Sequence, residues 1–181
     1  MRIVSGILKG RRITPPKNFK ARPTTDFAKE NLFNILSNNF DFTELSVLDL
    51  FSGTGSISYE FASRECTKVI SVESNFKHQA FIRNTIKELD LAQVKSYKSD
   101  SFRYVKSCRE KFDIVFADPP YELKTIETIP DFIFEHNILK EKGWLIVEHG
   151  DKTNFGKHKG FKEIRKYGGV NFSIFENYKI D

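Results

Sequence analysis

The chain has 181 residues, of which 39% are hydrophobic and 29% charged, and its formal net charge is +5. This length suits one domain whose core is large enough to need no disulfide, and the two cysteines stand apart without metal-ligand spacing, so we expect neither a disulfide nor a metal site. No apolar run approaches the roughly 20 residues that span a bilayer, and the first residues show no signal-peptide core, which predicts a cytoplasmic protein.

The first segment of the chain is the most basic. Residues 1–29 hold eight Lys and Arg side chains against Asp26 alone, whereas the rest of the chain is slightly acidic. This asymmetry is typical of proteins that bind a phosphate backbone, although basic termini are also often merely solvating. Apolar residues separated by Gly6 and Gly10 predict a small β-hairpin. We expect residues 1–24 to form a basic arm that contacts RNA, and residues 25–181 to form the main domain. The expected RNA contacts are Arg2, Lys9, Arg11, Arg12 and Arg22.

Strand and helix patterns alternate through the main domain. The apolar spacing predicts, in chain order, a helix that begins near residue 25, strand 47–51, helix 56–64, strand 68–73, helix 75–89, strand 94–99, a short helix at 102–105, strand 112–117, a helix within 125–136, strand 143–148, and strands 161–167 and 170–178. Alternation of this kind implies a parallel sheet covered on both faces. The last two strands flank Gly168-Gly169 and predict an antiparallel hairpin. The fold class is therefore α/β, and the final hairpin on a mostly parallel, seven-stranded sheet is typical of Rossmann-like methyltransferases.

A glycine loop follows the first predicted strand, in the segment Asp49-Leu-Phe-Ser-Gly-Thr-Gly55. Glycines at such a turn let the backbone approach a ligand closely. A dinucleotide site is disfavoured, because Ser58 stands where the third glycine of the GxGxxG fingerprint would be. The Asp49 carboxylate would also repel a pyrophosphate, whereas it would attract the ammonium group of a methionine moiety.

Two further acids stand at the ends of the next two predicted strands. Glu73 lies about 20 residues after the loop, where a carboxylate can accept hydrogen bonds from ribose hydroxyls. Asp100 could accept from an adenine amino group. A lone acid at a strand end is more often a solvated cap, but three of them together with the glycine loop favour S-adenosylmethionine as the cofactor. The expected cofactor site is Asp49, Phe51, Gly53, Gly55, Glu73, Asp100 and Ser101.

The most specific motif is Asp118-Pro-Pro-Tyr121, directly after the fourth predicted strand. An exocyclic amino nitrogen is a poor nucleophile unless its hydrogens are held so that its lone pair points at the methyl donor. The Asp118 carboxylate and the Pro119 carbonyl supply two acceptors, and Pro119 and Pro120 add rigidity without an N–H. Tyr121 supplies a face on which a flipped-out base can stack, which contributes about 1–3 kcal/mol. The competing interpretation, a plain turn, is disfavoured by the position of the motif after a buried strand and downstream of the glycine loop.

With these motifs, the chain resembles the RsmD family, which methylates guanine N2 in small-subunit (16S) ribosomal RNA. The resemblance covers nearly the whole chain and rests on Lys9-Gly-Arg-Arg-Ile13, Arg22-Pro-Thr-Thr-Asp26, Glu30-Asn-Leu-Phe-Asn-Ile-Leu36, the glycine loop and Phe112–Tyr121. It implies a Rossmann-like class I methyltransferase fold with an N-terminal hairpin, a hairpin-loop guanine as target, and the assembled small subunit as a candidate substrate. It also implies that the motif at Asp118–Tyr121 binds the target base, and that Arg22 and Thr24 border the methionine end or the RNA entrance.

The sequence departs from that family at two places and leaves other functions open. Ser58 replaces a glycine, and Glu65-Cys66 replaces a small pair, so we expect weaker helix-to-strand packing and weaker cofactor binding. One alternative is methylation of adenine N6 or cytosine N4 in DNA, but enzymes of that kind generally carry an extra domain for which this chain length leaves no room. A second is methylation of a protein glutamine amide, against which the basic arm argues. A third is a non-catalytic RNA-binding module, against which the intact motifs argue.

Overall fold

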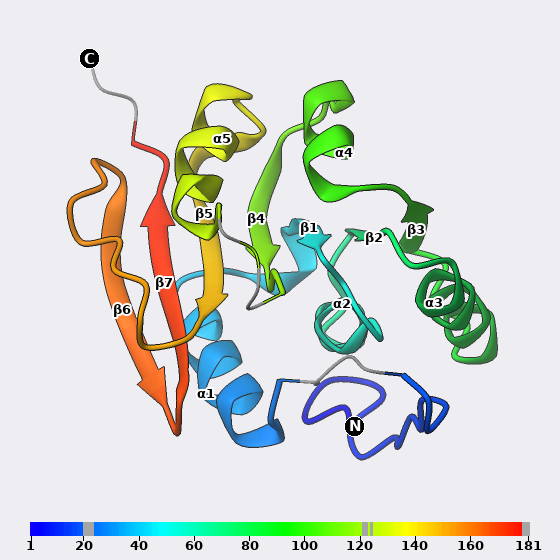
Figure 1. The fold of residues 1–181 in the computed structure, drawn as a ribbon. Coiled ribbons are helices and arrows are strands. Elements are labelled where there is room, and N and C mark those ends of the chain that lie inside the picture. Colours follow the sequence, from blue (N-terminus) through cyan, green and yellow to red (C-terminus); the bar gives the residue numbers. More distant parts are fainter. Residues whose placement is uncertain (20–23, 121–122, 124, 179–181) are drawn as a thin grey trace.

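Figure 1 shows a twisted sheet between two layers of helices in the computed structural model, which describes residues 1–19, 24–120, 123 and 125–178. Within those residues the sheet has seven strands in the order β3-β2-β1-β4-β5-β7-β6. Strands β1 to β5 pair in parallel, and β7 pairs antiparallel with β5 and β6. The strands are β1 (Ser46–Leu50), β2 (Lys68–Glu73), β3 (Val94–Lys98), β4 (Phe112–Ala117), β5 (Leu139–His149), β6 (Phe161–Tyr167) and β7 (Val170–Glu176).

Helices cover both faces of the sheet because both faces of its central strands are apolar. One face packs against α1 (Asp26–Ser37), α2 (Ser56–Ser63) and α3 (Phe76–Glu88), and the other against α4 (Ser101–Ser107) and α5 (Ile129–Glu135) (Figure 1). Two short 3-10 turns are η1 (Phe42–Glu44) and η2 (Ile126–Thr128). None of the helices in the described part of the chain is long and apolar enough to cross a membrane.

Alternation along the strands assigns each residue to one of the two faces. Val47, Phe116 and Ile146 belong to the core under α1, α2 and α3, whereas their neighbours on the same strands, such as Ala117 and Val147, belong to the core under α4 and α5. Since successive side chains of a strand point to opposite faces, Asp49 lies on the α1–α3 face, like Val47. This alternation decides which polar side chains can meet at the carboxyl edge of the sheet.

Most predicted elements are present, and the differences lie at their ends. Strand β5 starts at Leu139 rather than at residue 143, and its pairing with β4 shifts register between Phe112 and Ile114. The third strand ends at Lys98, so Asp100 does not end it. The carboxylate of Asp100 instead caps α4 and accepts a hydrogen bond from the Arg103 N–H at 2.9 Å.

The N-terminal segment folds back on itself as a short antiparallel hairpin, as predicted. A single antiparallel bridge joins Arg2 and Arg12. Backbone hydrogen bonds on either side of this bridge join the two arms, from the Ile3 N–H to the Arg11 carbonyl and from the Ile13 N–H to the Met1 carbonyl, both at 3.0 Å. The Glu60 carboxylate on α2 then accepts from the N–H groups of Val4 at 2.9 Å and Ser5 at 3.1 Å. This fully buried carboxylate docks the hairpin on α2.

Two further contacts fix this docking. The buried Lys29 ammonium donates to the Arg2 carbonyl at 2.5 Å and lies 3.6 Å from Glu60, which offsets part of the cost of burying both charges. Gly6 has φ +81°, and a Cβ on it would lie 1.9 Å from the Ser63 carbonyl oxygen. Any other residue at position 6 would push the segment away from α2. Because Gly55 is the N-cap of α2, the segment is tied to the helix that follows the glycine loop.

Candidate active site

The loop between β1 and α2 turns sharply at the carboxyl edge of the sheet. Phe51, Gly53 and Gly55 all have positive φ, of 57°, 55° and 82°. At Gly55 a Cβ would lie 2.6 Å from the Tyr59 ring, so glycine is required there by both φ and space. The Ser52 hydroxyl donates to the Asp49 carbonyl at 2.7 Å and fixes the start of the turn. The loop is therefore rigid before any ligand arrives.

Asp49 lies under this loop and is almost completely buried, with 1% of its surface exposed. The Ser58 hydroxyl donates to its Oδ2 at 2.5 Å. Burial raises the pKa of Asp49 to about 7, and the hydrogen bond from Ser58 opposes that rise. Ser58 was expected to loosen packing, but it is fully buried and supports the carboxylate, which a glycine could not do. A cation placed beside Asp49 would favour its ionised form.

Glu73, at the end of β2, links the loops that follow β1 and β2. Its Oε2 accepts from the Gly53 N–H at 2.8 Å, and its Oε1 accepts from the Asn75 N–H at 2.7 Å. Each carboxylate oxygen can accept more than one hydrogen bond, so both keep capacity for ligand hydroxyls. The structure thus places Glu73 against the glycine loop, and its predicted contact with ribose hydroxyls stays a prediction.

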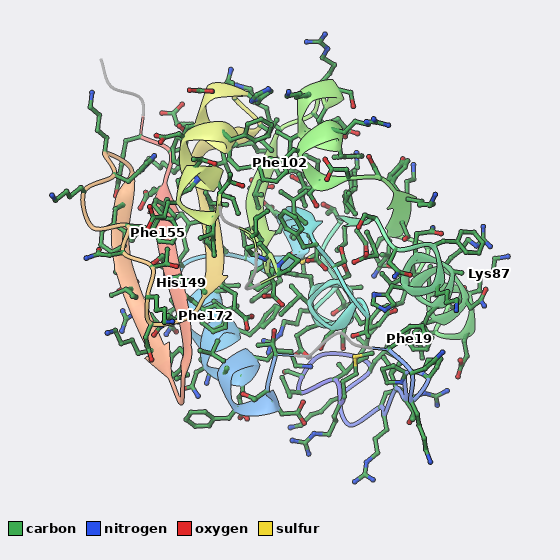
Figure 2. All side chains as sticks on the ribbon, viewed as in Figure 1. Phe19, Lys87, Phe102, His149, Phe155 and Phe172 are labelled. Atoms are coloured by element: carbon green, nitrogen blue, oxygen red, sulfur yellow. The ribbon has the colours of Figure 1, made fainter. Side chains whose placement is uncertain are left out.

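The loop after β3 meets the glycine loop from the other side. The Phe51 N–H donates to the Ser101 hydroxyl at 3.2 Å. The Phe51 ring lies 6.0 Å from that of Phe102, which in turn lies 5.1 Å from Phe132 on α5. Figure 2 shows Phe102 between α4 and α5. The expected cofactor residues on β1, β2 and the loop after β3 are therefore joined by direct contacts, with the exposed Asp100 at their edge.

The motif after β4 lies beside this cluster. Asp118 is half-buried, Pro119 is buried and Pro120 is exposed, while Tyr121 lies outside the described residues. Burial raises the pKa of the Asp118 carboxyl well above its ordinary value, and the negative charges of Glu148 and Asp49 raise it further. Asp118 and Asp49 therefore share one environment, although they come from strands that are far apart in the chain.

Glu148 is a residue of this edge that the sequence analysis missed. It is the second-last residue of β5, is only 5% exposed, and accepts a hydrogen bond from the Thr24 hydroxyl to its Oε2 at 2.8 Å. Parallel pairing of Ala117 with Val147 makes Glu148 the neighbour of Asp118. The rule that selected Glu73, an acid at the end of an apolar strand, would also have selected Glu148.

The expected RNA contacts lie on the docked N-terminal segment. Arg2, Lys9, Arg11 and Arg12 are all exposed, whereas Arg22 lies outside the described residues. Two of these side chains also form surface ion pairs within the chain: Arg2 lies 3.5 Å from Asp26, and Arg11 lies 3.6 Å from Glu88. Exposed pairs of this kind are weak, so these cations stay available to a phosphate backbone.

Comparison of the sequence with known proteins identifies the family of the chain. The family model described as Conserved hypothetical protein 95, the RsmD family, matches residues 1–176. The chain belongs to this family. It is 31% identical over 152 residues to the ribosomal RNA small subunit methyltransferase D of Haemophilus influenzae, which covers 82% of this chain and 78% of that protein. It is 28% identical over 149 residues to the protein of the same name in Escherichia coli K12, which covers 82% of this chain and 71% of that protein.

Solved structures share the fold of this RsmD-family chain. A hypothetical protein of Thermus thermophilus superposes with a TM-score of 0.86 over 98% of this chain and 99% of its own, at 20% identity. An RNA methyltransferase of Salinibacter ruber, in complex with S-adenosyl-L-homocysteine, superposes with a TM-score of 0.69 over 87% and 95%, at 15% identity. The predicted Rossmann-like class I fold is thereby confirmed.

Proposed function

We propose that this RsmD-family chain transfers a methyl group from S-adenosylmethionine to the exocyclic N2 of a guanine in small-subunit (16S) ribosomal RNA. The relatives named as small-subunit rRNA methyltransferases support the reaction and the class of substrate. The observation that carries the proposal is the half-buried Asp118, followed by two prolines, directly after β4, the strand that pairs with β1 and so lies beside Asp49. We further propose that the substrate is the assembled small subunit.

The residues present fit S-adenosylmethionine. Among the described residues, the partners of the buried Asp49 carboxyl are hydroxyl and backbone groups. Burial raises its pKa, and an ammonium group beside it would favour the charged form. Glu73 offers both oxygens to ribose hydroxyls, and Asp100 offers an acceptor to an adenine amine. We assign the cofactor site to Asp49, Phe51, Gly53, Gly55, Glu73, Asp100 and Ser101. When bound, the cofactor supplies a methyl group activated by its sulfonium.

The chain itself orients the amino group. The Asp118 carboxylate accepts one N–H of the base, and the Pro119 carbonyl accepts the other. With both hydrogens directed to the protein, the nitrogen lone pair points away from them and toward the methyl donor. Orientation of this kind can supply about 7–11 kcal/mol of a barrier. Pro119 and Pro120 keep the loop free of backbone donors, and we assign base stacking to Tyr121.

A proton must leave after the new N–C bond forms. The methylated nitrogen is cationic and its N–H is acidic, so a strong base is unnecessary. Asp118 is well suited to accept this proton, because burial and the charges of Glu148 and Asp49 raise the pKa of its carboxyl. The proton then passes to solvent, toward which Asp118 is partly exposed.

RNA binding is assigned to the docked N-terminal segment. Its exposed cations, Arg2, Lys9, Arg11 and Arg12, together with Arg22, would contact phosphates and orient the RNA without reading its sequence. Residues 1–24 are thus proposed as the RNA-contact unit and residues 25–181 as the methyltransferase domain. The hydrogen bonds to Glu60 keep the segment at a fixed place relative to the glycine loop.

The test is to map where the methyl group goes. The protein is incubated with S-adenosylmethionine labelled in its methyl group and with small subunits, free rRNA or duplex DNA, and the labelled nucleoside is identified. We expect N2-methylguanosine at one position of 16S rRNA, with the highest rate on small subunits. Label in adenine, in DNA or in protein would refute the proposal.

A further inference from the structure

Glu148 has a buried carboxylate at the candidate active site, and the reaction steps proposed above assign no role to it. Its neighbour Asp118 comes next to it at the carboxyl edge, because β4 and β5 pair Ala117 with Val147. Adjacent strands lie about 4.8 Å apart. Ala117 and Val147 belong to the core under α4 and α5, so the residues that follow them point to the opposite face, where Asp49 also lies. The two carboxylates therefore stand side by side on one face.

The orientation of Glu148 is fixed by a contact from far along the chain. The Thr24 hydroxyl, which precedes α1, donates to its Oε2 at 2.8 Å across 124 residues of sequence. Thr24 is itself buried, at 7% exposure. A glutamate needed only to end a strand would point to solvent, since burying a charge is costly. Glu148 is held at the edge where the target base must enter.

We propose, building on the proposed function, that Glu148 accepts the N1–H of the target guanine while Asp118 accepts the neighbouring N2–H, so that the carboxylate pair selects guanine. Guanine presents these donors side by side on its pairing edge, since N1 and N2 are both bonded to C2, and that edge becomes accessible once the base is flipped out. An ionised carboxylate can accept hydrogen bonds but cannot donate them, so a pair of carboxylates matches two neighbouring donors. Adenine has a bare acceptor at N1, which would face the Glu148 carboxylate without a hydrogen.

The electrostatics of the pair agree with this role. The negative charge of Glu148 raises the pKa of Asp118, which shows that the two carboxylates interact without a base in the site. Donors placed between two such acceptors relieve their repulsion. A base with an acceptor at N1 would add a third negative group there. Sites built to satisfy a buried polar group reject analogues that lack its partner far more strongly than apolar pockets do.

The experiment uses 2-aminopurine in place of the methylated guanine, in an rRNA fragment or in subunits reconstituted with it. This base keeps the N2 amino group but has an acceptor at N1. We expect the wild-type protein to prefer guanine at least a hundredfold in kcat/KM. In Glu148→Gln we expect the preference to fall to about tenfold or less, because the amide can donate to a bare N1 or accept from N1–H. Since 2-aminopurine also lacks O6, the deciding quantity is the change in preference between the two proteins.

Thr24→Val is the matched control, because it removes the hydroxyl but keeps the carboxylate. We expect a lower overall rate with the guanine preference unchanged. If Glu148 served only to hold Thr24, the two variants would lose rate in parallel and both would keep the wild-type preference, which would overturn the inference. A wild-type protein that methylates 2-aminopurine as well as guanine would overturn it without any variant. Absence of methyl transfer to any rRNA guanine would instead refute the proposed function.

Discussion

At the carboxyl edge of the sheet, the carboxylates next to β1–β3 and those next to β4–β5 have different hydrogen-bond partners. On the β1–β3 half, the chain itself supplies hydrogen-bond donors: Glu73 takes two backbone N–H groups, Asp49 takes the Ser58 hydroxyl, and Asp100 takes the Arg103 N–H. On the β4–β5 half, Asp118 receives no side-chain or backbone donor from the described residues, and its neighbour is a second carboxylate, Glu148. Both halves lie at the end of one parallel sheet.

This difference teaches how one edge performs two tasks. Donors supplied by the chain fix Glu73 and the glycine loop, so the cofactor half is preorganised and needs few changes on binding. On the other half, the Asp118 carboxyl takes no donor from the described residues and lies beside the like charge of Glu148 in a partly buried place. A ligand that brings hydrogen-bond donors to the β4–β5 half would therefore stabilise it, because the donors offset the repulsion between its carboxylates. Four changes test this division, two directed at carboxylates and two at the groups that support recognition.

The largest effect is expected from Asp118→Ala. Loss of the carboxylate removes an acceptor for the amino group and the group that takes its proton, so we expect the rate of methyl transfer to fall by about 10²–10⁴-fold. The dissociation constant of S-adenosylmethionine should change by no more than a few fold, because the cofactor half is fixed by its own hydrogen bonds. Single-turnover rates and calorimetry measure the two quantities.

The control for that variant lies on the same strand at its other end. Asp113 on β4 accepts from the Ser46 N–H at 2.8 Å and from Lys140, far from the carboxyl edge. Asp113→Asn should leave the single-turnover rate near the wild-type value. If Asp118→Ala kept the wild-type rate of methyl transfer, the proposal that the β4–β5 half of the edge carries the reaction would be wrong.

Asp49→Asn tests the cofactor half. A charge-assisted hydrogen bond to an ammonium contributes about 1.5–3 kcal/mol, so we expect affinity for S-adenosylmethionine to fall roughly ten- to a hundredfold. The pKa of Asp49 is raised to about 7 by burial, so the carboxyl is largely neutral below that pH. Wild-type affinity should therefore increase as pH rises through about 7 and level off roughly one pH unit higher, where the carboxyl is almost fully ionised, whereas the asparagine variant should lack this dependence. Calorimetry between pH 5.5 and 8 measures it, and a flat wild-type profile would contradict the assignment.

Local patterns in the sequence predicted most of the fold and part of the site. The alternation of apolar runs gave strands such as β2 and β4 at their observed bounds, and Gly168-Gly169 marked the β6–β7 turn. Asp118 and the glycine loop were found because each motif is contiguous. Strand order entered through the family resemblance, since periodicity does not say which strands are neighbours.

What the sequence missed depends on contacts between distant residues. Glu148 is brought to the site by the β4–β5 register and by its hydrogen bond from Thr24, 124 residues away. The hydroxyl of Ser58 reaches Asp49 because α2 packs over β1. In the sequence, Ser58 could be noted only as the replacement of a glycine, whereas in the fold it supplies a hydrogen-bond donor to Asp49. The predicted hairpin is docked by Glu60, on another element, whose carboxylate accepts from the N–H groups of Val4 and Ser5. Each of these depends on tertiary packing, which propensities do not include.

The basic segment should matter to RNA and not to either half of the edge. We expect Lys9→Gln, Arg11→Gln and Arg12→Gln together to weaken RNA binding about tenfold at physiological salt and to flatten its salt dependence, by roughly 0.7–0.9 in slope for each phosphate that is no longer neutralised. Affinity for S-adenosylmethionine should stay the same. The matched control neutralises three exposed cations, Lys106 in the last turn of α4 and Arg109 and Lys111 in the segment between α4 and β4. If the RNA affinity of both triple variants depended equally on salt concentration, the N-terminal segment would not be part of the RNA interface.

The smallest effect is expected from Ser58→Ala. The Ser58 hydroxyl donates to Asp49 and favours its charged form, so its removal should raise the pKa of Asp49 further. At pH 7 a larger fraction of Asp49 is then neutral, and affinity for S-adenosylmethionine should fall about two- to tenfold, the range of one hydrogen bond. The loss should shrink at pH 8.5, where the carboxyl ionises in either protein.

A double-mutant cycle decides whether this effect passes through Asp49. In the Asp49→Asn background there is no carboxylate to charge, so Ser58→Ala should change cofactor affinity and its pH dependence very little. If the serine change weakened binding equally in both backgrounds, Ser58 would act by packing alone, and the cofactor half would not depend on donors supplied to its buried acid.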